Sequence, residues 1–194
     1  MKQAEIVKKL TPKELVFQVY VTQGLVLAAA AVIGFFLFDS LQEFTKLWSG
    51  DVQEVLVYGG IAGLAALLVD FFLMKTAPGE WYDDGGINEK IFANIPVAHI
   101  FFLTMLISFS EEILFRGVIQ SNLGYYTASI LFAVLHIRYL GKFLLFSVVT
   151  ALSFFLGWLF MITGNLFVTV FAHFIIDFVM GAYIRFTYLK SMDE

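Results

Sequence analysis

The feature that most constrains the fold of this chain is a series of apolar segments, each about as long as a lipid bilayer is thick. A helix that crosses a membrane needs about 20 mostly apolar residues, and such runs recur from residue 15 to residue 188. Apolar residues make up 60% of the 194 residues and charged residues 14%, whereas a soluble domain carries about a quarter charged residues. The sequence therefore predicts an all-α fold, a polytopic transmembrane helix bundle.

About six spanning helices are expected. The fourth apolar segment is the shortest, and we expect it to be either a full span, a half-length helix or a re-entrant one. The first segment is long enough to span and is not followed by the small-residue pattern of a cleavage site, which predicts a retained helix. We expect one membrane domain over residues 1–194, with helices and a polar loop in 1–90 and a core in 91–188. The expected spans are roughly 15–38, 52–74, 91–120, 125–139, 142–162 and 165–188.

Lys and Arg residues in the short loops predict the orientation, because cytoplasmic loops of membrane proteins are enriched in both. With six spans, ten of the twelve cations lie on the side that holds both ends of the chain. We therefore expect an integral protein of the cell (plasma) membrane, in contact with membrane lipid and with both termini in the cytoplasm. No basic run indicates a nucleic-acid partner, and the absence of Cys excludes disulfides and thiolate metal sites. The ten cations are Lys2, Lys8, Lys9, Lys13, Lys75, Lys90, Arg138, Lys142, Arg185 and Lys190, and Lys46 alone lies on the other side.

Three ionisable residues interrupt the third apolar segment. An ionisable side chain in mid-bilayer costs about 2.5–3.5 kcal/mol on insertion scales, so such groups are usually paired, hydrated or functional. Glu112 and Arg116 are four residues apart on one helix face, which predicts an ion pair. Glu111 lies about 100° around the helix axis from Glu112, with no partner expected on its own helix. A carboxylate in that position is suited to act as a general base.

Two histidines lie in other apolar segments. His136 ends the fourth segment, and His173 lies deep in the sixth with Asp177 four residues later on the same face. A carboxylate beside an imidazole fixes the tautomer and raises the basicity of the ring, although a packing hydrogen bond between helices is also consistent with this pattern. Asp70, near the end of the second segment and close to Lys75, is interpreted as a structural or interface charge.

One carboxylate and two imidazoles on three helices have two chemical interpretations. Glu111, His136 and His173 could bind a zinc ion, since two His and one carboxylate suit a catalytic zinc with an open position. Alternatively, Glu111 activates water without a metal, while the imidazoles polarise the scissile carbonyl and stabilise the oxyanion. Both interpretations end in hydrolysis.

These residues form three ordered motifs that resemble those of the CPBP intramembrane proteases (CAAX protease and bacteriocin-processing, or Abi), relatives of the type II CAAX prenyl endopeptidase. The resemblance covers roughly residues 95–180. The motifs are EExxxR at Glu111, Glu112 and Arg116, followed by Gly117; FxxxH at Phe132 and His136; and HxxxN or HxxxD at His173 and Asp177.

The resemblance implies an endopeptidase that hydrolyses a bond in a membrane-associated peptide or protein. Glu111 would activate water, His136 and His173 would complete the site, and Glu112 with Arg116 would hold its geometry, while Phe132 belongs to the second motif. Some members of the family have Asn at the position of Asp177, and an Asp cannot donate a hydrogen bond unless it is protonated. Asp177 is therefore better suited to orienting His173 or to ligating a metal.

Two other functions fit intramembrane polar residues. The first is a non-proteolytic membrane scaffold or immunity protein of the same family. The second is a small transporter that uses Glu111 as a proton relay, against which stand the few spans and the absence of an internal repeat. The depth of the residues adds a condition for the enzyme. Glu111 and His136 meet only if the fourth span is short or tilted, or if the third helix continues well past Arg116, and we expect a cavity open to one side.

Overall fold

The computed structural model describes residues 9–82, 84–136, 139 and 141–193. Within these ranges the secondary structure is helical and contains no strand. Among the same residues, five helical segments are long and apolar enough to cross a membrane, and a sixth apolar helix is shorter. These observations confirm the all-α polytopic bundle, including a short fourth member.

The helices of the bundle are named here in chain order. The first span is α2 (Pro12–Leu37), and the second combines α4 (Val52–Glu54), the π-helical η1 (Val55–Gly59) and α5 (Gly60–Thr76). The third combines α8 (Val97–Glu112), the π-helical η2 (Ile113–Gln120) and α9 (Ser121–Leu123). The short helix is α10 (Tyr125–Leu135), and the last two spans are α11 (Phe143–Thr163) and α12 (Leu166–Asp193). Three connecting helices are α3 (Leu41–Thr45), α6 (Gly79–Tyr82) and α7 (Ile87–Phe92).

A capping interaction sets the start of the first span. The Thr11 hydroxyl accepts a hydrogen bond from the Glu14 amide at 3.3 Å, and the Glu14 carboxylate accepts one from the Thr11 amide at 2.7 Å. This capping box, with Pro12 in the first turn, satisfies amide groups that a helix start leaves without partners. Helix α2 therefore begins close to the expected start of the first span.

Hydrogen bonds join the turn between α11 and α12 to the start of the second span. Helix α11 ends at Gly164, which has a φ of +64° and so adopts the left-handed conformation that glycine tolerates best. The buried Asn165 side chain accepts a hydrogen bond from the Ser49 amide at 3.2 Å and donates one to the Glu54 carboxylate at 2.8 Å. The break predicted at Gly164 and Asn165 is thus a structured turn.

Two boundaries refine the predicted spans. The third helix starts at Val97, later than the expected residue 91, because Pro96 forms its N-cap and residues Ile87–Phe92 form α7. A residue before proline is disfavoured in a helix, which accounts for the interruption. At its other end the third helix continues past Arg116 to Leu123. Helix α10 has 11 residues, which is roughly 16 Å at 1.5 Å per residue and about half of a bilayer core.

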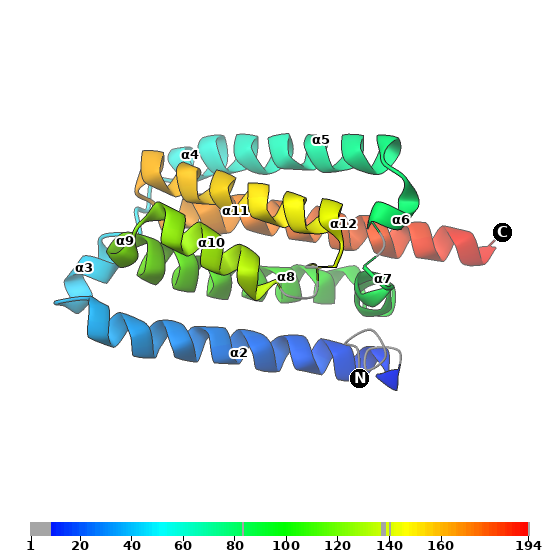
Figure 1. Ribbon diagram of the computed structural model, residues 1–194, viewed down its shortest axis with the longest axis horizontal. Helices are drawn as coiled ribbons and strands as arrows, with labels where there is room; N and C mark the ends of the chain where they lie inside the picture. Colours follow the sequence, from blue (N-terminus) through cyan, green and yellow to red (C-terminus); the bar gives the residue numbers. More distant parts are fainter. Residues whose placement is uncertain (1–8, 83, 137–138, 140, 194) are drawn as a thin grey trace.

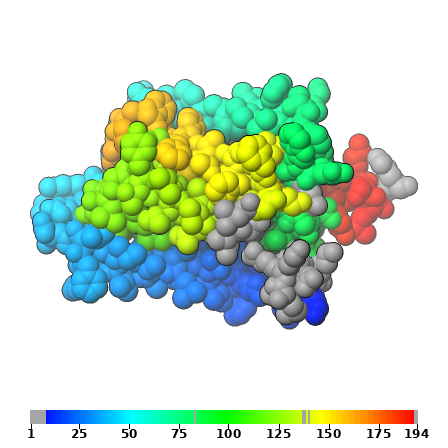
Figure 2. All heavy atoms as spheres, in the orientation of Figure 1, coloured from blue at the N-terminus to red at the C-terminus, as the bar shows by residue number. Residues whose placement is uncertain are grey.

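Helix α12 lies at the centre of the bundle and packs against α8, α5, η1 and α11. Figure 1 shows α5 along one side, α2 along the opposite side, and α8, α10, α11 and α12 between them. The outer surfaces of α2 and α5 carry large exposed apolar side chains such as Phe35, Phe36 and Phe72, which suit contact with lipid tails. In Figure 2 the side chains of α2, α10, α11 and α5 lie next to one another on one face.

Both ends of the described chain lie at one end of the bundle. Helix α2 begins there, α12 ends there, and α6 and α7 lie between them (Figure 1). Helix α10 runs back toward this end, and the chain reverses after it into α11. The short helix therefore leaves His136, its C-cap residue, within the depth of the bundle.

Candidate active site

The bundle encloses a cavity of about 1090 Å³. The residues predicted to do chemistry all line it: Glu111 from α8, His136 after α10, and His173 and Asp177 from α12. The depth condition is met because α10 is short and the third helix is long. The cavity extends to Asp84, just before α7, and to Glu89 within α7, at the end of the bundle where α2 begins.

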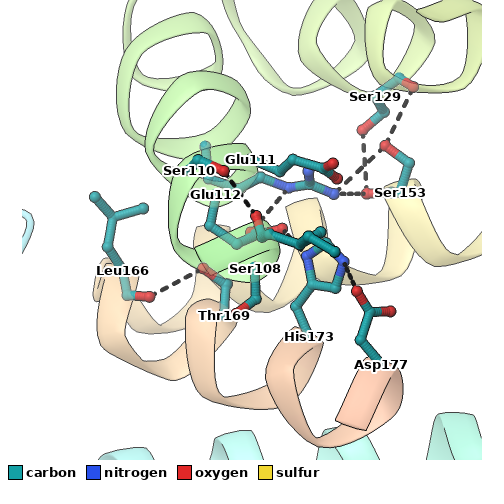
Figure 3. A network of polar contacts seen from close by, with 12 residues as sticks. Ser108, Ser110, Glu111, Glu112, Ser129, Ser153, Leu166, Thr169, His173 and Asp177 are labelled. Atoms are coloured by element: carbon teal, nitrogen blue, oxygen red, sulfur yellow. Dashed lines mark hydrogen bonds and ion pairs between the residues drawn. The ribbon is translucent and has the colours of Figure 1, made fainter. Parts of the chain in front are cut away.

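Glu112 forms the buried centre of the polar network in Figure 3. Its side chain is fully buried, and its Oε2 atom lies 3.3 Å from the Nε atom of Arg116. The ion pair expected from the four-residue spacing is therefore present. Its Oε1 atom lies 2.9 Å from Nδ1 of His173. This second contact joins α8 to α12.

Arg116 joins the third span to α10 and α11. Its Nη2 atom donates a hydrogen bond to the backbone oxygen of Ser153 at 3.0 Å, and the Ser153 hydroxyl donates one to the backbone oxygen of Ser129 at 3.2 Å. The guanidinium carbon lies 4.8 Å from the centre of the Phe132 ring, within the range of a cation–π interaction. Phe132, the first residue of the FxxxH motif, thus supports the cation that pairs with Glu112.

His173 lies between two carboxylates. Its Nδ1 atom faces Glu112, and its Nε2 atom lies 3.5 Å from Oδ2 of Asp177 on the next turn of α12. Figure 3 shows the Asp177 carboxylate directed at this ring. The protonated ring can donate to both carboxylates, so the arrangement holds the imidazole in one orientation.

His136 is held by its own helix end. Its Nδ1 atom lies 2.8 Å from the backbone oxygen of Phe132, and its ring stacks on the Phe132 ring with the two centres 4.5 Å apart. A carbonyl oxygen can only accept, so Nδ1 carries the hydrogen in this contact. In the neutral ring Nε2 is then the acceptor, and in the cationic ring it is a second donor.

Glu111 is held by a residue that the motifs do not contain. Gln23, buried on α2, donates a hydrogen bond from Nε2 to Oε1 of Glu111 at 3.1 Å. The Oε1 atom of Gln23 accepts a hydrogen bond from the Ser110 hydroxyl at 2.5 Å, which fixes the orientation of the amide. The sequence carries one signal for this role, an amide side chain inside an otherwise apolar helix. Because Gln23 lies outside the three motifs, it is not among the predicted site residues.

The arrangement of donors does not support the zinc interpretation. In the described part of the chain, no three His, Asp or Glu side chains are grouped so that they could hold a metal ion. Both ring nitrogens of His173 face carboxylates. Among the described residues, Glu111, His136 and His173 share a cavity but are not grouped as a metal-ligand set.

Asp70 occupies a different place from the one expected. It is buried on α5 and lines the same cavity, whereas the sequence suggested a structural or interface charge beside Lys75. No ion pair with Lys75 is found among the described residues. Helix α5 therefore also contributes a carboxylate to the cavity wall.

Comparison with known proteins identifies the group to which the chain belongs. A family model described as "Type II CAAX prenyl endopeptidase Rce1-like" matches residues 93–179, a range that contains all three motifs. Over 169 residues the chain is 49% identical to "Uncharacterized protein YpbD" of Bacillus subtilis (strain 168), which covers 87% of this chain and 89% of that protein. No solved structure matches the chain. The chain thus belongs to the CPBP family of intramembrane proteases, which includes the Rce1-like type II CAAX prenyl endopeptidases.

Proposed function

We propose that this protein is an intramembrane endopeptidase in which Glu111 activates the attacking water. The observation that carries the proposal is that Glu111, His136, His173 and Asp177, from three separate helices, line one cavity inside the bundle. Family membership supports the reaction class, the hydrolysis of a peptide bond at the membrane.

In the proposed reaction, the Glu111 carboxylate takes a proton from water while the water oxygen bonds to the scissile carbonyl carbon. The carbonyl oxygen becomes an oxyanion. When the tetrahedral intermediate collapses and the carbon–nitrogen bond breaks, Glu111 passes its proton to the leaving amine. The hydrogen bond from Gln23 supports this role, because it fixes one carboxylate oxygen and leaves the other for water.

His136 is proposed to stabilise the oxyanion. A preorganised donor aimed at the developing charge is worth about 10²–10³ in rate. His136 can supply such a donor from Nε2 when its ring is protonated, since Nδ1 already donates to Phe132. His173 is proposed to complete the site, and Asp177 and Glu112 orient its ring. The Glu112–Arg116 pair is proposed to act through His173 rather than on the substrate.

The test is cleavage of membrane-anchored peptides by the purified full chain in liposomes. We expect the wild-type protein to cut at least one member of a peptide panel and Glu111→Gln to lose about 10²–10⁴ in rate, as expected for the loss of a general base. Glu43→Gln is the matched control, because Glu43 is exposed on α3 at the opposite end of the bundle. Cleavage by Glu111→Gln at the wild-type rate would exclude Glu111 as the base.

The scaffold alternative predicts instead that the cellular phenotype survives Glu111→Gln and His173→Ala.

We also propose that the protein lies in the plasma membrane with both termini in the cytoplasm. The cavity would then be reached from the cytoplasm. The support is the distribution of cations. At the end of the bundle toward which the cavity extends, α2 begins, α5 and α12 end, and α6 and α7 lie. Four cations belong to these helix ends or to α7: Lys13, Lys75, Lys90 and Lys190. Positive charge of this kind marks the cytoplasmic side.

A further inference from the structure

Asp70 is a buried carboxylate on the wall of the active-site cavity, and it has no partner among the described residues. Its side chain belongs to α5, only 8% of the residue is exposed, and it lines the cavity that holds Glu111 and His173. No hydrogen bond or ion pair joins it to another residue in the described ranges. A buried carboxylate is costly unless a cation or a hydrogen-bond donor compensates it.

A second polar group on the same wall also lacks a partner. The Tyr82 hydroxyl oxygen is buried, and it makes no hydrogen bond within the described chain. Tyr82 lines the cavity from α6. Burial and then the nearby Asp70 carboxylate raise the pKa of Tyr82 to about 12, so the hydroxyl keeps its proton. Two unsatisfied polar groups therefore lie close together beside the cavity.

The charge of the cavity indicates what would satisfy them. Among the described residues that line it there are five carboxylates and no Lys or Arg. Asp84 accepts hydrogen bonds from three backbone amides at the start of α7, and Glu111 is bound by Gln23. Asp70 has no such bond, and it lies within electrostatic range of Asp177. The five carboxylates are Asp70, Asp84, Glu89, Glu111 and Asp177.

We propose that Asp70 and Tyr82 form a specificity subsite that binds the cationic side chain of a Lys or Arg residue in the peptide substrate. The ammonium or guanidinium group would donate to the Asp70 carboxylate and to the Tyr82 oxygen. Met74, one turn after Asp70 on the same face of α5, also lines the cavity and offers an apolar surface for the stem of that side chain. This inference rests on the proposed peptidase function.

The first experiment measures binding without cleavage. The full chain carrying Glu111→Gln, in detergent micelles, is titrated with two acetylated and amidated peptides that differ only in one residue, Lys or norleucine. Blocked ends leave the Lys side chain as the only charge, so binding of a free amino terminus is excluded. A charge-assisted bond in a buried site predicts that the Lys peptide binds about tenfold more tightly or better.

Variants assign that preference to the subsite. Adding Asp70→Asn is expected to bring the ratio of the two affinities close to one, and Tyr82→Phe is expected to lower it in part. Asp39→Asn removes the same charge from an exposed position before α3 and is expected to keep the ratio. Equal affinities for the two peptides, or an unchanged ratio in Asp70→Asn, would overturn the subsite whether or not the protein cleaves peptides.

The second experiment links the subsite to cleavage. Wild-type protein in liposomes is incubated with a library of membrane-anchored peptides, and the cut sites are read by mass spectrometry. We expect Lys and Arg to be enriched at one position relative to the cut, and the enrichment to disappear in Asp70→Asn. Cleavage without any such enrichment would overturn this inference and leave the peptidase function standing. A lack of any cleavage, together with a Lys preference in binding, would count against the peptidase function alone.

Discussion

At the residue scale, the site contains two kinds of carboxylate. Glu112 is fully buried, with Oε2 in an ion pair with Arg116 and Oε1 in a hydrogen bond with His173. Glu111, its neighbour, is partly exposed to the cavity and held by one hydrogen bond from Gln23. Because consecutive residues of a helix point about 100° apart, one of the two braces the helices while the other faces the cavity.

Gln23 is expected to be a positioning residue for Glu111. Replacing it with Leu removes the hydrogen bond and puts an apolar side chain of similar size in its place. A hydrogen bond to a charged group is worth about 1.5–3 kcal/mol, so we expect a loss of about 10- to 100-fold in rate. We expect the loss to appear in kcat while KM stays near the wild-type value, which a general loss of fold would not produce. The measurement is steady-state cleavage of a membrane-anchored peptide.

The control for this prediction is Gln42→Leu, which removes an exposed amide on α3 at the other end of the bundle. It is expected to cleave at the wild-type rate. A wild-type kcat for Gln23→Leu would show that Glu111 does not depend on this bond.

At the element scale, the close contact between α5 and α12 sets the shape of the site. Helix α12 carries His173 and Asp177, and α5 packs against it with Asp70 on its cavity side. A Cβ atom at Gly63 would lie 3.0 Å from the Cβ of Ile175 and 3.1 Å from the backbone oxygen of Ala172. The two helices can approach this closely only because Gly63 has no side chain.

We expect Gly63→Ala and Gly60→Ala to have opposite effects on stability. At Gly63 the added methyl group meets backbone and Cβ atoms that cannot move away, and overpacking of this kind costs about 1–3 kcal/mol. At Gly60 the nearest atom is the Phe171 ring at 3.9 Å, an ordinary contact. There the higher helix propensity of Ala is expected to be neutral or stabilising, by up to about 1 kcal/mol.

Thermal unfolding of both variants in detergent measures the difference. A lower melting temperature for Gly63→Ala and an equal or higher one for Gly60→Ala is the expected result. Equal changes in the two variants would show that close packing at Gly63 does not hold α5 against α12.

At the scale of the whole molecule, the half-length helix α10 gives the site its depth. Helix α10 ends at Leu135 with His136 as its C-cap, and η2 of the long third helix packs against it. Glu111 and His136 therefore reach the same cavity. Six full spans would have placed the two residues toward opposite faces of the membrane.

The proposed orientation can be read by labelling, because the chain contains no Cys. Glu89→Cys places one thiol at the mouth of the cavity, and Gln42→Cys places one at the opposite end of the bundle. In intact cells, a membrane-impermeant maleimide is expected to label Gln42→Cys and to label Glu89→Cys only after permeabilisation. The reverse pattern would place the cavity on the outer side.

Features that depend on one segment at a time can be predicted from the amino-acid sequence. The length of each apolar run predicts the spans, and the four-residue spacing predicts that Glu112 lies beside Arg116 and His173 beside Asp177. These features follow from helix geometry and from the apolar interior of the membrane, both of which act locally. Most span boundaries were predicted to within a few residues, and Pro96 explains the late start of the third helix.

Contacts between polar groups on different helices depend on the tertiary structure and are seen only there. The contacts of Glu112 with His173 and of Gln23 with Glu111 each join two helices, and Asp70 lines the cavity because of the way α5 is rotated against α12. These spanning helices are apolar around most of their circumference, since lipid and protein neighbours are both apolar. Their sequences therefore carry little information about which face turns inward, and the packing of the whole bundle settles it.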